Sequence, residues 1–193
     1  MTIKFNKSET LILVALEEEC PRELLSEWRV EYSGVGKVNA IISLSKAVSQ
    51  ERPKTVINFG TAGSSDANLQ GLKEVTTFKQ RDMDVRGLLD FKLGETPFDK
   101  INEIINSDEG FSCGSGDSFV NNKIEMSVDL VDMEAYALAK VCKLENVKFR
   151  CFKYVSDNAD ENAPNDWIEN CKKGAKLFQN KLKQSLIQNE QCY

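Results

Sequence analysis

Short apolar runs alternate with loops of small and acidic residues along this chain. Residues 10–16 form one run, which ends in three glutamates, and residues 55–59 form another, which ends in Gly60-Thr61-Ala62-Gly63. Between these runs, a glycine turn at 34–36 leads into residues 38–48, whose apolar side chains recur at helical spacing. Strands, small-residue loops and helices in this alternation are typical of an α/β protein with a central sheet.

The second half of the chain continues the alternation. The pattern predicts a helix over 98–105, a strand over 111–113, a helix that opens at Val131–Ala135 and a strand over Lys148–Val155. A last helix is predicted to begin near Asn165-Asp166, a suitable helix start, and to cover one face of the sheet. Its apolar stripe comprises Trp167, Cys171, Ala175, Phe178, Leu182 and Leu186.

Two segments carry weaker patterns. Residues 21–28 begin with a proline, which suits a first helical turn, and are predicted to form a short helix. Residues 66–96 are polar and weakly periodic, so no element is predicted there. Because no repeat, low-complexity tract or linker divides the chain, we expect a single α/β domain over residues 1–193.

Composition is that of a globular protein, with 41% hydrophobic and 28% charged residues. The length of 193 residues allows one sizeable core. A net charge of −5 and the lack of a long Lys/Arg block argue against nucleic acid or an anionic membrane as a partner. The apolar run at 11–16 is too short to span a membrane and lacks a cleavage site after it.

The chain has six cysteines without paired spacing, and it has no histidine. We therefore predict reduced thiols in a cytoplasmic protein, with no metal and no other cofactor. Without histidine, proton transfer in an enzyme falls to carboxylic acids. Their pKa values reach the useful range when burial or a neighbouring negative charge raises them.

Two acidic segments stand out, Val131-Asp132-Met133-Glu134-Ala135 and Ser156-Asp157-Asn158-Ala159-Asp160. One predicted helix and one predicted strand separate them, which puts Glu134 and Asp157 at the mouths of neighbouring elements, where both carboxylates can face one pocket. The three glutamates at 17–19 follow a strand. Ligands bind at the carboxyl ends of strands in open α/β sheets, so one of the three is a further candidate.

Three other patterns do not support a site. The segment at 34–37 lacks the first glycine and the Ser/Thr of a phosphate-binding P-loop and is interpreted as a tight turn. Residues 157–168 are acidic but lack the glycine and the last glutamate of an EF-hand. Asp82 and Asp84 are interpreted as part of a solvated loop.

Six segments in order resemble the nucleoside phosphorylase superfamily, and most closely its methylthioadenosine/S-adenosylhomocysteine nucleosidase branch. They cover most of the chain: Val14–Glu19, Ser33–Ala40, Val56–Gly63, Ser115–Val120, Val131–Ala135 with Ala139–Cys142, and Val155–Asp160. The resemblance implies a central mixed β-sheet flanked by helices. The stretch between Glu19 and Gly34 is shorter here than in typical relatives, which removes most of a hairpin from the family's sheet.

The resemblance also implies roles. Glu19 would activate the attacking water, Glu134 would hold the sugar hydroxyls and Asp157 would assist protonation of the purine. The implied nucleoside contacts are Thr61 and Gly63 of the glycine loop, Phe119 stacking on adenine, the backbone of Val120 at the base edge, Met133 on the sugar face, Ser156 orienting Asp157, and Leu89 and Phe91 in a loop like the one that lines the 5′ pocket.

The implied activity is hydrolysis of the N-ribosidic bond of 5′-modified adenosines to release adenine. Phosphorylases of the superfamily usually carry an arginine before the glycine loop, where Asn58-Phe59 stand here, so water is the predicted nucleophile. A phosphorylase and a non-catalytic nucleoside-binding protein on the same scaffold are the alternatives. The expected partners are a small nucleoside and a second copy of the chain in a homodimer.

Overall fold

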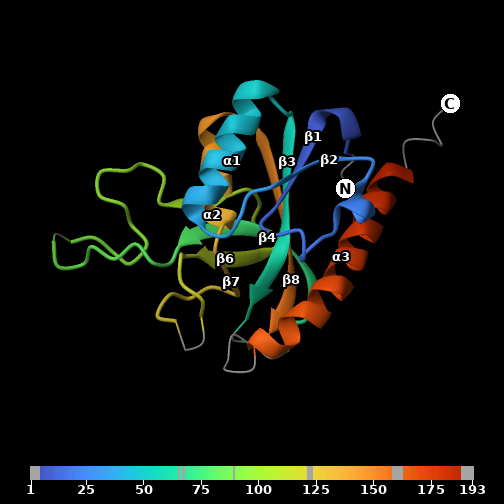
Figure 1. The fold of residues 1–193 in the computed structure, drawn as a ribbon. Helices are drawn as coiled ribbons and strands as arrows, with labels where there is room; N and C mark the ends of the chain where they lie inside the picture. The colour runs from blue at the N-terminus through green and yellow to red at the C-terminus, as the bar shows by residue number, and fades with distance from the viewer. Residues whose placement is uncertain are drawn as a thin grey trace.

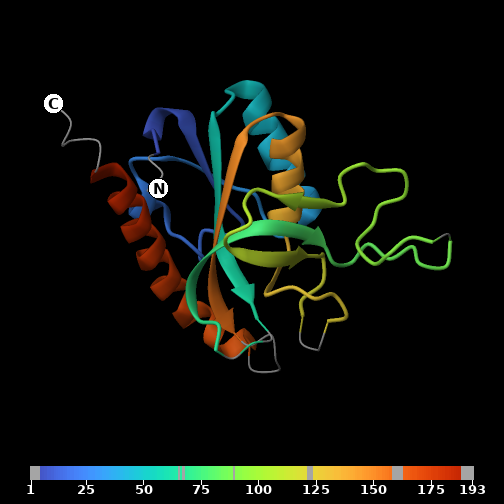
Figure 2. The same cartoon turned by 180° about the vertical axis from the view of Figure 1, so that it is seen from behind.

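The computed structural model describes residues 5–64, 66, 68–88, 90–120, 124–157 and 163–187, without the side chains of 157–169 and 187. The fold has three layers (Figures 1 and 2). Helices α1 (Lys37–Gln50) and α2 (Ala135–Leu144) pack together on one side of the sheet. Helix α3 (Ala163–Ile187) packs against β8 on the other side. The expected α/β fold with a mixed sheet flanked by helices is therefore confirmed.

The sheet has the strand order β2-β1-β3-β7-β6-β4-β5, and β8 pairs with both β3 and β4. Two short 3₁₀ helices, η1 (Lys7–Glu9) and η2 (Arg22–Leu25), flank β1. The strands are β1 (Thr10–Val14), β2 (Arg29–Tyr32), β3 (Thr55–Gly63), β4 (Gly71–Gln80), β5 (Glu103–Ile105), β6 (Phe111–Ser115), β7 (Leu130–Asp132) and β8 (Lys148–Asp157).

The pairings of five strands close into a circuit that runs from β3 through β8, β4, β6 and β7 back to β3. Its last link is a single antiparallel pair, Gly63 with Val131. On its other side Gly63 is paired with Asp157 at the end of β8. The circuit thus gathers the glycine loop and both acidic segments at one end of the sheet.

Strand β1 shows why its sequence is apolar without alternation. Leu11 and Leu13 belong to the core under α1 and α2, whereas Ile12 and Val14 belong to the core under α3. Both faces of the strand are buried, so every position is apolar after Thr10. On the α3 side, Phe59 of β3 stacks on Phe178 at 4.4 Å between ring centroids.

The predicted helix over 98–105 is wrong. Phe98 has a φ of +61°, which a helix does not allow, and residues 103–105 form the edge strand β5, antiparallel to β4. Only the middle residue of β5, Ile104, is buried, as expected for a strand with one face on the core. Asp99 and Asn102 bind local backbone amides instead of allowing a helix to form.

The remaining differences are smaller. The predicted helix at 21–28 is reduced to the 3₁₀ turn η2. The polar stretch at 66–96, where no element was predicted, contains the long strand β4. Its Lys73 and Glu74 oppose Lys153 and Phe152 of β8, and Glu74 is ion-paired with Arg150. Strand β4 was not predicted because its polar residues give no strand-like hydrophobic pattern, although the strand is paired on both sides.

Five of the six cysteines lie in the described part of the chain, where they are buried and free; Cys192 lies outside it. Burial raises the pKa of the thiols of Cys20, Cys142, Cys151 and Cys171 to about 12, so they stay protonated. Among the described residues, no helix is both long enough and apolar enough to cross a membrane.

Candidate active site

A cavity of about 440 Å³ opens at the end of the sheet where the glycine loop meets the two acidic segments. The segment between β7 and α2, the loop after β1 and the loop after β6 complete its wall. The predicted site residues that line it are Glu19, Thr61, Gly63, Phe119, Val120, Met133, Glu134 and Ser156. A volume of this size is typical of small-molecule sites.

Glu19 is the glutamate of the 17–19 run that faces the cavity. It is 5% exposed, whereas Glu17 and Glu18 point to solvent. Its Oε1 accepts hydrogen bonds from the Thr61 amide at 2.7 Å and from Thr61 Oγ1 at 2.6 Å. Its Oε2 has a longer contact, 3.4 Å, with the amide of Leu16. Thr61 therefore fixes one carboxylate oxygen more firmly than Leu16 fixes the other.

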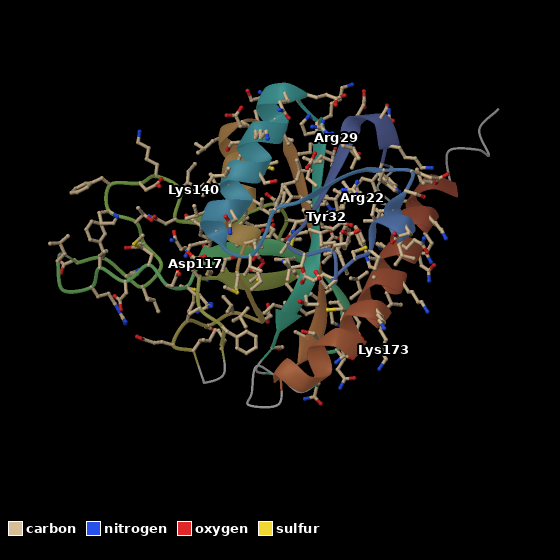
Figure 3. All side chains as sticks on the ribbon, in the orientation of Figure 1. Arg22, Arg29, Tyr32, Asp117, Lys140 and Lys173 are labelled. Carbon is tan, nitrogen blue, oxygen red and sulfur yellow. The ribbon has the colours of Figure 1, made fainter. Side chains whose placement is uncertain are left out.

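The loop that carries Glu19 is anchored from the short strand β2. Tyr32 donates a hydrogen bond to the carbonyl of Cys20 at 2.7 Å, and the Arg22 guanidinium lies 5.2 Å from the centre of the Tyr32 ring (Figure 3). Tyr32 itself is held by the parallel pairing of β2 with β1. These contacts position the loop although the stretch between Glu19 and Gly34 is short.

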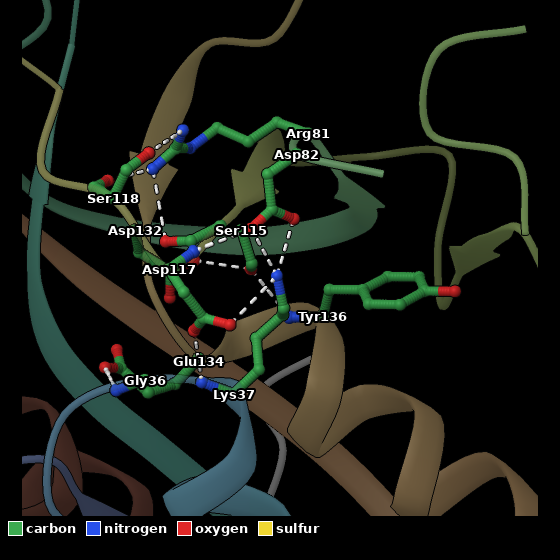
Figure 4. Close-up of polar contacts among 11 residues, drawn as sticks. Gly36, Lys37, Arg81, Asp82, Ser115, Asp117, Ser118, Asp132, Glu134 and Tyr136 are labelled. Carbon is green, nitrogen blue, oxygen red and sulfur yellow. Dashed lines mark hydrogen bonds and ion pairs between the residues drawn. The ribbon is translucent and has the colours of Figure 1, made fainter. Parts of the chain in front are cut away.

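Glu134 precedes α2 and is 7% exposed. Its Oε1 accepts a hydrogen bond from the amide of Gly36 at 2.8 Å (Figure 4). Burial and the neighbouring Asp132 raise the pKa of this carboxyl from 4.5 to about 7, against the lowering effects of Lys153 and the Gly36 amide. Near neutral pH the group therefore lies at the midpoint of its titration.

Asp132 and Lys153 form a buried ion pair beside Glu134, with 2.8 Å between Lys153 Nζ and Asp132 Oδ2 and both side chains 1% exposed. Asp132 also accepts from Ser115 Oγ at 2.5 Å and from the Ala135 amide at 2.9 Å. Burial opposes ionisation of Asp132, but Lys153 and these hydrogen bonds outweigh it and hold the pKa of the carboxyl below its ordinary value.

Carboxylates accept hydrogen bonds from backbone amides at the end of the glycine turn at 34–36. Gly36 has a φ of +95°, which favours glycine, so the tight turn predicted from the sequence is confirmed. The next amide, that of Lys37, donates to Asp117 Oδ1 at 2.7 Å, and Lys37 Nζ binds Asp82 at 2.5 Å (Figure 4). Asp82 thus belongs to an ion-pair network and is not simply a solvated loop residue.

Arg81 and the loop after β6 form another part of the wall. The Arg81 guanidinium donates to Ser118 Oγ at 3.1 Å, to the Gly116 carbonyl at 3.1 Å and to the Ser118 carbonyl (Figure 4). The next residue, Phe119, is 58% exposed although it lines the cavity. An aromatic ring exposed at a cavity wall is well placed to stack on a flat ligand.

Of the other three predicted site residues, only Phe91 has a described side chain, and it is not among the described residues that line the cavity. The backbone of Asp157 ends β8 beside Gly63, and its side chain lies outside the described part of the structure. Leu89 also lies outside the described residues. Phe91 packs edge-on against Phe98, at 6.1 Å between ring centroids, in the long loop that projects from the body of the fold in Figure 1.

The sequence patterns missed the Asp132–Lys153 pair and the Lys37 network. A lysine between Phe152 and Tyr154 in a predicted strand was the available signal for Lys153, but its partner is set by strand pairing. As for metals, the described residues contain no group of three or more Cys, Asp or Glu side chains that could hold an ion.

Comparisons with known proteins agree with this arrangement. A family model described as the phosphorylase superfamily matches residues 106–187. The chain is 31% identical over 156 residues to a 5′-methylthioadenosine/S-adenosylhomocysteine nucleosidase of Glaesserella parasuis, covering 67% of each chain. It is 29% identical over 187 residues to the nucleosidase of the same name from Marinomonas sp., covering 81% of this chain and 79% of the relative.

Two solved structures from Helicobacter pylori have similar folds. A mutant of its methylthioadenosine nucleosidase with 5′-methylthioadenosine in the active site has a TM-score of 0.82 at 24% identity, covering 94% of this chain and 98% of the other. A futalosine hydrolase has a TM-score of 0.81 at 24% identity, covering 91% and 96%.

Proposed function

This chain belongs to the methylthioadenosine/S-adenosylhomocysteine nucleosidase branch of the phosphorylase superfamily, and we propose that it hydrolyses the N-ribosidic bond of 5′-modified adenosines to release adenine. The observation that carries the proposal is the convergence of Glu19 and Glu134, two buried carboxylates, on one cavity that also holds Phe119. Cleavage of an N-ribosidic bond builds positive charge on the sugar and negative charge on the base. Carboxylates beside the sugar lower the cost of the first charge.

Glu19 is assigned to the attacking water. Because Thr61 holds its Oε1, the orientation of the carboxylate is fixed before substrate binds. A water in the cavity that donates to the Glu19 carboxylate would become more nucleophilic as the carboxylate takes up its proton. Fixing both the base and the water supplies the proximity that a bimolecular attack in solution lacks.

Glu134 is assigned to the sugar hydroxyls. The Gly36 amide orients one of its oxygens, and Met133 beside it offers an apolar surface to the sugar. A charged acceptor near the hydroxyls gains strength as the sugar becomes positive, so its effect is largest in the transition state.

The base is assigned to Phe119, Val120 and Asp157. Phe119 offers a stacking surface and Val120 a backbone edge at the cavity wall. Asp157, from the end of β8, would hold or donate the proton that neutralises the departing purine, with Ser156 orienting it. That role requires a raised pKa for Asp157.

Water is favoured over phosphate as the nucleophile by the existing pairing of Lys37 and of the amides at the glycine turn. Lys37 is bound to Asp82 and Asp117, and the amides of Gly36 and Lys37 already donate to carboxylates. Asn58, at the position where phosphorylases usually carry arginine, is buried and donates to the Leu13 carbonyl at 3.0 Å. A dianion entering here would have to displace these internal pairs.

A homodimer is proposed as the working form. Apolar side chains on α1 are exposed in the single chain, with Val38 at 65% and Ile42 at 61%, and this helix begins at the cavity. Phe98, in the projecting loop that also holds Phe91, is 89% exposed. A second copy that covers these residues would explain their exposure and could complete an apolar 5′ pocket.

The proposal is tested by incubating the purified protein with methylthioadenosine in phosphate-free buffer and measuring adenine by chromatography. Adenine release by the wild type and its loss in Glu134→Gln support the function. S-adenosylhomocysteine, 5′-deoxyadenosine and futalosine, assayed in parallel by chromatography of the released purine (adenine from the first two, hypoxanthine from futalosine), define the 5′ group. Absence of product from all four would refute nucleosidase activity.

A further inference from the structure

Lys153 is an unusual residue for its place in the fold. It lies within β8, which is paired on both sides, and it is 1% exposed. Its neighbours on the same face of the strand, Cys151 and Val155, belong to the apolar core under α1 and α2. An apolar residue would be the ordinary choice here, and a buried ion pair is weak evidence for a gain in stability. The lysine therefore needs another explanation.

The position of its ammonium group gives one. Lys153 Nζ binds Asp132, which stands two residues before Glu134 and lines the same cavity. Gly60 of β3 lies near both this ammonium group and the carboxylate of Glu19. A Cβ atom added to Gly60 would lie 3.2 Å from Lys153 Nζ and 3.3 Å from Glu19 Oε1. The ammonium thus lies beneath the cavity, between the ion-pair partner Asp132 and the proposed base Glu19.

Several charged or polar groups face Glu134 from the elements around it. They are Glu19 after β1, the Gly36 amide at the start of α1, Asp132 of β7 and Lys153 of β8, with Arg81 after β4 on the same cavity wall. Asp132 and Glu19 disfavour the charged form of Glu134, whereas Lys153 and the Gly36 amide favour it. Lys153 is the cation in this set that acts directly on Glu134.

We propose that Lys153 is a positioning residue for the reaction: its buried ammonium, held in place by Asp132, favours the ionised form of Glu134 beside the sugar while a second carboxylate, Glu19, occupies the same cavity. The inference rests on the proposed nucleosidase function for its catalytic consequence. The electrostatic relation itself depends only on the placement of these groups. Without the cation, two buried carboxylates in one cavity would favour uptake of a proton by one of them.

The test compares the pH profile of kcat/KM for methylthioadenosine between pH 5 and 9 in four variants. Lys153→Met should move the acid limb to higher pH by about one unit, and Asp132→Asn should move it to lower pH. Lys153→Arg retains the charge and should keep the wild-type limb. The matched control is Lys79→Met, which removes a lysine from a strand where it pairs with Glu103 nearer the surface.

A lysine that is merely structural would give a different result. Lys153→Met would then lower kcat/KM by the same factor at every pH and leave the acid limb in place, which would overturn the proposal. Circular dichroism establishes which variants fold. If Lys153→Met does not fold, Asp132→Asn tests the proposal. A shift of its acid limb to lower pH supports the proposal, and an acid limb that stays in place overturns it.

A second measurement separates this proposal from the proposed function. Titration of the ¹³C-labelled glutamate carboxyl carbons by NMR, with Glu134→Gln identifying the resonance, reports Glu134 without any turnover. An inactive wild type refutes the nucleosidase function, yet the opposite shifts of Glu134 in Lys153→Met and Asp132→Asn still support the electrostatic relation. Equal Glu134 titrations in wild type and in these variants overturn it.

Discussion

Replacing Glu134 by glutamine should inactivate the protein and also stabilise it at alkaline pH. The pKa of Glu134 in the folded protein is raised from 4.5 to about 7 by burial and Asp132. A carboxyl with a raised pKa contributes stability that is fully present below pH 4.5 and lost as the pH rises through about 7. At about 1.4 kcal/mol per pH unit, keeping the buried carboxylate ionised at pH 8 costs the fold about 3 kcal/mol.

The glutamine side chain has nearly the same shape, can still accept from the Gly36 amide and carries no charge. We expect Glu134→Gln to exceed the wild type in free energy of unfolding by about 1 kcal/mol at pH 5 and by about 3 kcal/mol at pH 8. Turnover should fall by about 10²- to 10³-fold, as when one preorganised group that stabilises transition-state charge is removed.

Urea unfolding of both proteins at pH 5 and pH 8 measures the effect. Titrating groups that do not interact with Glu134 contribute equally to both proteins, so they cancel in the difference in free energy of unfolding. The conservative exchange Glu18→Gln, at an exposed glutamate, serves as the control and should show no such change. If the Glu134→Gln difference is the same at both pH values, the account of the buried carboxylate is wrong.

Three further variants probe the assigned roles. Glu19→Gln should lower kcat by about 10²-fold or more while Glu18→Gln stays near wild type, since only Glu19 faces the cavity; equal activities would remove Glu19 from the mechanism. Asp157→Asn should lower cleavage of adenosine-type substrates by about 10²- to 10⁴-fold, with rescue by a base that leaves without protonation; equal, small losses on both substrates would leave Asp157 structural. Phe119→Ala should raise KM by about tenfold or more in a direct kinetic comparison, and an unchanged KM would exclude stacking on the base.

How far the sequence predicts this molecule depends on how local each signal is. The strands around β1 and β3 were predicted from their apolar runs, β8 from the apolar and aromatic residues between its basic ones, and the glycine turn at 34–36 because its residues favour it. A helix was wrongly predicted over 98–105 because a few apolar residues fit a helical period as well as they fit a short strand.

The site also contains features that local sequence signals predict and features that they do not. Glu134 and one of the three glutamates at 17–19 were predicted as site candidates from the elements next to them, whereas the choice of Glu19 came from the family resemblance; both line the cavity. The Asp132–Lys153 pair could not be predicted, because its partners come from different strands that are brought together through β3 and the register of the closed circuit. The contact between Lys37 and Asp82, 45 residues apart, depends in the same way on the topology that brings the end of β4 beside the start of α1.

The identity of the sugar product tests the central claim most directly. Methylthioadenosine is incubated with the wild-type protein in the presence of excess phosphate, and the products are followed by ³¹P NMR and quantitative chromatography. The account predicts one free methylthioribose for each adenine and no new phosphorus signal, with the same rate when phosphate is omitted. Formation of methylthioribose 1-phosphate in step with adenine would contradict it and would make phosphate, not water, the nucleophile in this cavity.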